Sequence, residues 1–251
     1  MKRYFISALT LLAISGLLSS CNKESGIAPP PVYGQIYFHL HTNIDTAETD
    51  TLKICTDASG RRIRLRVAQF YASNFKLQKT DGSWLTINHA YLLKTIANEM
   101  CYIGSVPSGN YNTIAFDTGL DPDMNSASPL SYSSGSIFAT QNPAMWFGSI
   151  ARGYMFLNVQ ALVDTSASHT GPVNQPVSYQ TGTASMLRTV NFPYKPFSVV
   201  TNMTTFVHIT CDFGKLLQGI DFKTQSTATP FNNAVVANQI ANNIPGMFRY
   251  E

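Results

Sequence analysis

A run of alternating apolar and polar residues from Arg61 to Lys79 constrains the fold more than any other feature of the sequence. Side chains two residues apart on a β-strand share a face, so this period predicts a long, half-buried strand. The other face carries three arginines, which we expect to be solvated unless they contact a lipid headgroup or another polyanion. The expected buried face consists of Ile63, Leu65, Val67, Tyr71, Phe75 and Leu77, and the arginines are Arg62, Arg64 and Arg66.

Most of the remaining chain also favours strands. Helical character is limited to the C-terminal end, where Val236, Ile240 and Ile244 recur every four residues. Asn232 suits the N-cap of this helix, and Pro245 followed by glycine would stop it. We therefore expect an all-β fold over residues 34–251, a single antiparallel β-sandwich or flattened barrel with a short C-terminal helix. The other expected strands lie within residues 34–45, 51–55, 84–103, 112–117, 153–159 and 192–213.

Residues 1–20 have the pattern of an export signal and are not expected to belong to the fold. Lys2 and Arg3 precede a short apolar segment, too short to remain as a membrane-spanning helix. The segment ends in Leu-Ser-Ser-Cys21, which resembles a bacterial lipobox, in which the cysteine carries the lipid. An ordinary secretory signal that happens to lie near a cysteine is the alternative.

Residues 21–33 would then form a lipidated Cys21 and a polar, proline-containing tether. Asn22 directly after the cysteine resembles the signal for sorting to the outer membrane. The sequence therefore predicts an outer-membrane lipoprotein that contacts the membrane through its lipid anchor, with the domain either periplasmic or facing the cell surface.

Charged residues make up 12% of the chain, against about 25% in an average protein. Without Lys2 and Arg3, 17 − 2 = 15 basic residues face 14 acidic ones, a net charge of +1, which does not indicate nucleic-acid binding. Apart from Cys21, the cysteines are Cys55, Cys101 and Cys211, and their spacing matches no zinc motif. They are expected to be small buried residues, although one disulfide would be possible in an oxidising compartment.

The motifs of the common hydrolases and nucleotide-binding enzymes are absent, so we do not expect an enzyme. Asp121, Asp123 and Asn125 alternate like the start of a calcium loop. Ser126 and Tyr132 occupy positions where an EF-hand needs glycine and glutamate. A turn that uses these side chains for local hydrogen bonds is the simpler interpretation. Calcium is therefore a less favoured bound ion than a transition metal.

Two histidines, His39 and His41, lie two residues apart in the first expected strand and would share a face. Neutral imidazoles suit copper or zinc, and a tight site needs at least one further ligand. His208 is the candidate, because it lies on another expected strand between two apolar residues. His89 and His169 lie near expected turns. Hydrogen-bonded structural histidines are the alternative interpretation of the pair.

Residues 121–152 form the longest irregular stretch, and long loops in compact domains are often functional. Its aromatic and amide side chains could bind a glycan, a peptide or a protein partner without catalysis. The residues that suggest this alternative are Asn125, Tyr132, Phe138, Gln141 and Trp146.

Several stretches, in order along the chain, resemble the MbnP-like family. They are Gln69-Phe70-Tyr71-Ala72-Ser73-Asn74-Phe75-Lys76-Leu77 with Asp81-Gly82, Val106-Pro107-Ser108-Gly109-Asn110-Tyr111, Phe116-Asp117-Thr118-Gly119-Leu120-Asp121 with Asn125, Met145-Trp146-Phe147, Gly153-Tyr154-Met155-Phe156, and Asn243-Ile244-Pro245-Gly246-Met247-Phe248.

The resemblance implies copper binding by an exported protein of methanobactin-type systems. It also implies a MauG-like dihaem enzyme as partner, which oxidises a tryptophan to kynurenine, and Trp146 is the matching residue. The chain departs from the family pattern at Gln180, where many members have a histidine. A second tryptophan near Trp146, and a further histidine between Gln225 and Asn233, are also missing.

Overall fold

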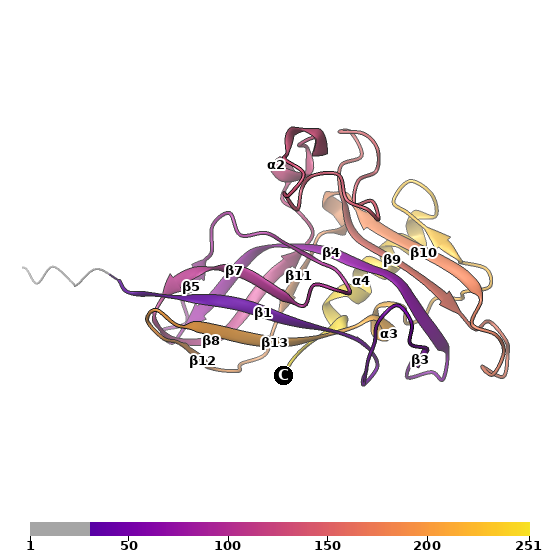
Figure 1. Ribbon diagram of the computed structural model, residues 1–251, viewed down its shortest axis with the longest axis horizontal. Helices are drawn as coiled ribbons and strands as arrows, with labels where there is room; N and C mark the ends of the chain where they lie inside the picture. Colours follow the sequence, from indigo (N-terminus) through magenta and orange to yellow (C-terminus); the bar gives the residue numbers. More distant parts are fainter. Residues whose placement is uncertain (1–30) are drawn as a thin grey trace, which may run out of the picture. The chain divides into compact units, whose positions relative to one another are not determined.

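The structure is a computed structural model that describes residues 31–251. The expected export signal, Cys21 and most of the tether lie outside the described residues. The folded unit runs from Val32 to Glu251 and consists of two curled β-sheets with short helices (Figure 1). In the described part of the chain, no helix combines the length and the apolar character needed to cross a membrane.

The first sheet has five strands, with β1 at its centre between β7 and β13. Although the sequence predicts an antiparallel architecture, β1 and β13 run parallel over nine residue pairs. Figure 1 shows these two strands side by side along one side of the molecule. The strands of this sheet are β1 (Tyr33–Ile44), β2 (Ala47–Glu48), β7 (Met100–Pro107), β13 (Thr204–Asp212) and β15 (Phe248–Tyr250).

The second sheet is built around the long strand β4, which pairs with β8 on one side and β9 on the other. Its ten strands are β3 (Cys55–Thr56), β4 (Arg62–Lys79), β5 (Trp84–Thr86), β6 (Leu92–Lys94), β8 (Gly109–Thr118), β9 (Met155–Val163), β10 (Gln175–Gly182), β11 (Arg188–Asn191), β12 (Phe197–Val199) and β14 (Thr227–Ala228). The prediction of a mostly β fold is confirmed.

The prediction of one continuous apolar face on β4 is wrong at Val67 and Tyr71. A register shift between Leu65 and Val67 inserts a residue, which reverses the parity of the strand. Phe70 therefore faces the main core, while Tyr71 packs in a second cluster on the other side of the sheet. A further shift restores the original parity, and Phe75 again lies in the main core.

The main core lies between the inner faces of the sheets. The Phe38 ring of β1 packs against Phe75 of β4, with ring centroids 5.4 Å apart, and against Phe116 of β8, at 5.6 Å. Helix α4 (Ala234–Met247) adds the predicted apolar stripe to this core. The other helices are α2 (Pro122–Asn125), α3 (Phe213–Leu216) and two 3₁₀ turns at Pro129–Ser131 and Ala184–Met186.

The ends of α4 differ from the sequence prediction. Asn233, not Asn232, is the N-cap, and it adopts a left-handed conformation with φ of 51° and no side-chain cap. Pro245 lies inside the helix, which ends at Met247. Because this proline falls in the last turn, it removes only one hydrogen-bond donor and does not stop the helix.

Some short strands were not correctly predicted. Residues 51–54 are not strand, and only Cys55–Thr56 forms β3. The strands β2, β10 and β11 have no counterpart in the prediction. β2 and β11 are too short for a period-two pattern to be evident, and pairing with β1 and β8 holds them in place.

The three cysteines of the described chain are free and buried, which agrees with the expectation of small buried residues. Burial raises the pKa of the Cys101 thiol to about 11 and that of the Cys211 thiol to about 12. Both thiols are therefore protonated at neutral pH and are poor metal ligands.

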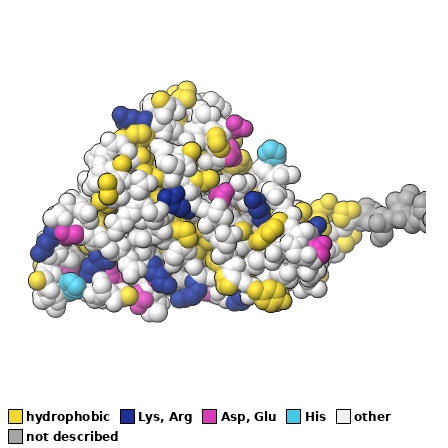
Figure 2. Space-filling model, turned by 180° about the vertical axis from the view of Figure 1, so that it is seen from behind, with side chains coloured by type: hydrophobic (Ala, Val, Ile, Leu, Met, Phe, Trp, Pro, Cys, Tyr) yellow, Lys and Arg dark blue, Asp and Glu magenta, His cyan; other side chains and the backbone are white. Residues whose placement is uncertain are grey.

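The surface carries few charges, as the composition implies. On the face in Figure 2, uncharged polar and backbone atoms dominate, and the lysine and arginine side chains are interspersed with acidic ones.

Candidate metal centre

The alternation of β1 places two imidazoles on the outer face of the first sheet. Phe38 is fully buried and Leu40 is 1% exposed, so both point into the core. His39 and His41 therefore point outward, with 26% and 23% of their side chains exposed. The same-face arrangement that the sequence predicts is present in the structure.

The parallel pairing of β1 with β13 brings the third histidine to the same place. His208 is the direct register partner of His39. Its neighbours Val207 and Ile209 are buried, at 1% and 0% exposure, so the His208 side chain also lies on the outer face. Two segments about 170 residues apart in the chain thus present one group of three imidazoles.

The three rings are close together. The ring centroids are 4.0 Å apart for His39 and His41, 4.8 Å for His39 and His208, and 5.8 Å for His41 and His208. One nitrogen of each ring lies within 4.8 Å of one nitrogen of the other two. In a tetrahedral zinc site with metal–nitrogen bonds of about 2.1 Å, ligand nitrogens are roughly 3.4 Å apart. Side-chain rotations that draw the rings together by about 1 Å would therefore complete a chelate.

Carboxylates surround the three imidazoles. Glu99 Oε2 lies 3.7 Å from His39 Nε2, and Glu251 Oε2 lies 3.9 Å from His41 Nε2. Glu48 and Glu99 also form a second group with His41, in which the three ligand atoms lie within 4.8 Å of one another. The local charge thus favours a cation.

The surroundings also keep His39 in the form that binds metal. Partial burial lowers the pKa of His39, and the neighbouring His41 and His208 lower it further, while Glu99 opposes the shift. A lowered pKa favours the neutral imidazole near neutral pH, and metals bind neutral imidazole.

A lysine is buried behind the same strand. Lys94 is 0% exposed, and its ammonium donates hydrogen bonds to Thr42 Oγ1, at 2.9 Å, and to the Thr95 carbonyl, at 2.6 Å. Burial lowers the pKa of Lys94. Thr42 faces the core, so this lysine supports β1 from the inside and does not belong to the histidine face.

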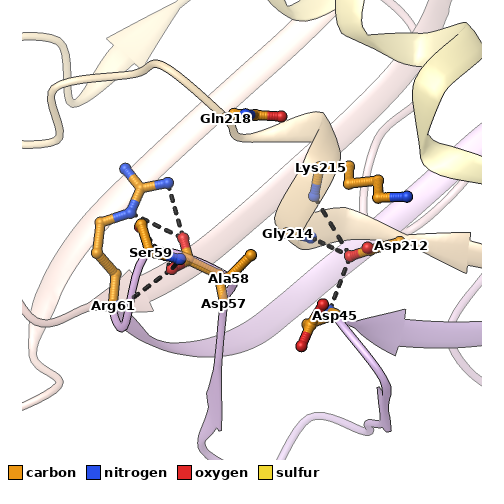
Figure 3. A pocket seen from close by; sticks show the side chains of 9 residues that line it. All are labelled: Asp45, Asp57, Ala58, Ser59, Arg61, Asp212, Gly214, Lys215 and Gln218. Carbon is orange, nitrogen blue, oxygen red and sulfur yellow. Dashed lines mark hydrogen bonds and ion pairs between the residues drawn. The ribbon is translucent and has the colours of Figure 1, made fainter.

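A pocket of about 300 Å³ at the ends of β1 and β13 gathers other charged groups, but they are committed to structure (Figure 3). Asp57 accepts hydrogen bonds from Ser59 and from the Arg61 backbone and guanidinium. Asp212 accepts from the backbone N–H groups of Asp45, Gly214 and Lys215. These carboxylates close two turns.

The calcium-like stretch is likewise structural. Asp121 caps α2 by accepting a hydrogen bond from Met124 N, and it accepts another from the Tyr91 hydroxyl, at 2.5 Å. Asn125 Oδ1 accepts from Tyr154 N. The interpretation as local hydrogen bonding agrees with this geometry.

Trp146 lies in a different part of the molecule, in the loop next to β9 and β10. Its indole packs edge-on against Tyr154, with ring centroids 4.9 Å apart. On β10, the Gln180 amide donates hydrogen bonds to Ser178 Oγ, at 2.8 Å, and to Asn158 Oδ1, at 3.4 Å. Asn158 in turn donates to the Ala144 carbonyl. The donor groups here are amides, whereas copper and zinc prefer imidazole ligands.

Two of the loop side chains that suggested a binding surface are engaged within the protein. Gln141 donates to three carbonyls of its own loop. The Phe138 ring packs against Tyr71, Tyr91, Tyr132 and Tyr154. These aromatic contacts belong to the second apolar cluster.

Sequence reasoning missed the three glutamates. Glu48 lies outside the expected strands and Glu99 lies within the expected strand stretch 84–103, and the proximity of both to the histidines depends on pairing with β1. Glu251 reaches the site because its backbone N–H donates to the His208 carbonyl. No periodicity in the sequence could have indicated this convergence.

Comparisons with known proteins agree with this fold. The family model for MbnP matches residues 33–235. Among solved structures, MbnP from Methylosinus trichosporium is similar, with a TM-score of 0.51 and 14% sequence identity over 80% of each chain. No curated protein sequence matches the chain.

Proposed function

Because the chain belongs to the MbnP family, which is associated with copper handling, we propose that it binds a transition-metal ion, copper foremost, through His39, His41 and His208. The convergence of three imidazoles from β1 and β13 is the observation that carries this proposal. Three imidazoles on two paired strands lie close together before any ion binds, so only side-chain rotations are needed to complete a chelate.

Each part of the protein has a role in this proposal. The alternation of β1 and β13 aims the rings outward, and the buried residues beneath them fix the strands. The neighbouring carboxylates, 3.7 Å from His39 Nε2 and 3.9 Å from His41 Nε2, attract the cation. Copper, when bound, would be the cargo of the protein, which we propose acts without catalysis.

The location and partner are further parts of the proposal. The lipobox-like residues ending in Cys21 support an outer-membrane lipoprotein that carries the domain on a short tether. The family resemblance of the Trp146 loop supports a MauG-like enzyme as partner. Mass spectrometry of protein from the native host tests both: we expect acyl chains on Cys21 and oxidation of Trp146, and an unmodified residue rejects the corresponding part.

Metal titration of the purified protein tests the central proposal. Competition against a chromophoric chelator should show that the wild type binds copper tightly. The affinity should fall by more than about 100-fold in His39→Asn, His41→Asn or His208→Asn, which exceeds the loss typical when only a hydrogen-bond partner of a ligand is replaced. His89→Asn is the matched control, because His89 is exposed and has a φ of 55° that asparagine tolerates. Equal, weak binding by all the variants and the wild type would reject the proposal.

A further inference from the structure

Glu99 is placed to act on the histidine site as more than a neighbouring charge. Its backbone carbonyl accepts a hydrogen bond from Leu40 N, at 2.8 Å, which fixes the residue beside β1 between the two histidines of that strand. Its carboxylate lies 3.7 Å from His39 Nε2 and belongs to the group that includes His41. Glu99 thus reaches both imidazoles of β1.

The other two glutamates are placed differently. Glu251 accepts a hydrogen bond from Thr210, whose hydroxyl also accepts one from Arg249. The Glu251 carboxylate is therefore partly engaged, and it approaches only His41. Glu48 belongs to the same group with His41 as Glu99 does, but among the described residues it forms no ion pair with His39, whereas Glu99 does.

We propose that Glu99 is the fourth ligand of the site, so that His39, His41, His208 and Glu99 bind Zn²⁺ or Cu²⁺ in preference to Cu⁺. This inference rests on the proposed function and adds the class of ion. A carboxylate is a hard, anionic ligand that suits divalent ions, whereas Cu⁺ prefers soft sulfur ligands. Four protein ligands also close a tetrahedral site, which suits holding an ion rather than activating a bound water.

The structure also supplies the competing donor. Met100 is the direct register partner of His39 on β7, and its side chain is 43% exposed, on the same outer face. Directly opposed residues have Cβ atoms about 4.5–5.5 Å apart, so its thioether is within reach of a metal at the histidines. Sulfur from Met100 would favour Cu⁺, while oxygen from Glu99 favours divalent ions.

Two adjacent substitutions separate these possibilities. Chelator competition measures metal affinity in the purified full chain as wild type, Glu99→Gln and Met100→Leu. The ions are Zn²⁺, Cu²⁺ and, under anaerobic conditions with a reductant, Cu⁺. Glu99→Gln should weaken Zn²⁺ and Cu²⁺ binding by at least about 10–100-fold, which is the loss typical when a residue that only hydrogen-bonds to a metal ligand is replaced. The Cu⁺ affinity should change by less than about threefold, and Met100→Leu should leave divalent binding unchanged.

Asp45→Asn is the matched control for charge alone, because Asp45 follows β1, belongs to no potential ligand group among the described residues and has a φ of 54° that asparagine tolerates. It should weaken divalent binding by less than about threefold, as expected for a solvated charge. Tight, histidine-dependent binding of Zn²⁺ and Cu²⁺ that Glu99→Gln leaves intact would overturn the role of Glu99 alone. A wild-type preference for Cu⁺ that is lost in Met100→Leu would also overturn the role of Glu99. If the wild type binds none of the three ions tightly, the proposed function fails and this inference fails with it.

Discussion

The histidine face of β1 and β13 and the Trp146 loop beside β9 and β10 use their polar side chains in opposite ways. On the histidine face, three imidazoles converge at the surface and point at one another. Around Trp146, the side chains of Gln180 and Asn158 are occupied by hydrogen bonds. The Trp146 loop carries part of the family resemblance, whereas the three converging imidazoles lie on β1 and β13.

Replacing Tyr154 should have the largest effect, and it should act on stability alone. Tyr154 is 1% exposed, packs against Tyr71 and Trp146, and donates a hydrogen bond to the Phe138 carbonyl. Tyr154→Ala should lower the free energy of unfolding by about 3–5 kcal/mol, as for other large aromatic residues. Chemical denaturation measures this change. Tyr154→Phe, which loses only the hydroxyl, should cost about 1 kcal/mol. A change in metal affinity in a folded Tyr154→Phe protein would contradict the separation of the two regions.

His41→Asn should show the converse behaviour. The side chain is partly exposed and lies outside the core, so the free energy of unfolding without metal should change by less than about 1 kcal/mol. Addition of Zn²⁺ should raise the melting temperature of the wild type but not of the variant, because a ligand stabilises only the state that binds it. The same metal-induced shift in both proteins would show that the ion binds elsewhere.

Trp146→Phe should have a smaller effect. The indole is half-buried and packs on Tyr154, and a smaller ring should retain part of that contact. The expected loss of stability is about 1 kcal/mol, within the usual range for an aromatic pair. Metal affinity of the recombinant protein should be unchanged, and titration of both proteins tests this. A loss of affinity above about tenfold would place Trp146 at the metal site.

The pH dependence of stability should reveal the histidine face in the metal-free protein. Burial and its histidine neighbours lower the pKa of His39 below its ordinary value of 6.5. The unfolded chain therefore binds the proton more readily, and this group destabilises the folded state as the pH falls below about 6.5. Above that pH the contribution disappears. Denaturation midpoints between pH 7.5 and 5 should show a smaller decrease in His39→Asn than in the wild type, and equal slopes would contradict this account.

Gln180→His should have the smallest effect. This change introduces a histidine at the position where the family resemblance leads us to expect one, but its surroundings on β10 supply amides and a hydroxyl. Copper affinity should therefore stay within about twofold of the wild type, since one added imidazole without partners does not make a tight site. A large gain in affinity would show that the Trp146 region retains the other ligands of a site.

Local periodicity was sufficient to predict the long strands and the shared face of His39 and His41, but not the strands β2, β10 and β11. His39 and His41 could be placed on one face because strand alternation is a local property. The parallel pairing of β1 with β13 could not be predicted, since it depends on packing of the whole chain. Glu99 and Glu251 were missed for the same reason. On β4, the predicted face failed at Tyr71, because a register shift changes the alternation without a clear signal in composition.

The position of a bound metal ion tests the central claim most directly. Crystals of the purified protein grown with Zn²⁺ or Cu²⁺ can be measured at the absorption edge of the metal, where an anomalous difference map locates the ion. We predict a peak on the outer face of β1 and β13, about 2.0–2.2 Å from one nitrogen each of His39, His41 and His208. A peak beside Trp146 and Gln180, or no peak at the histidines at saturating metal, would contradict the account.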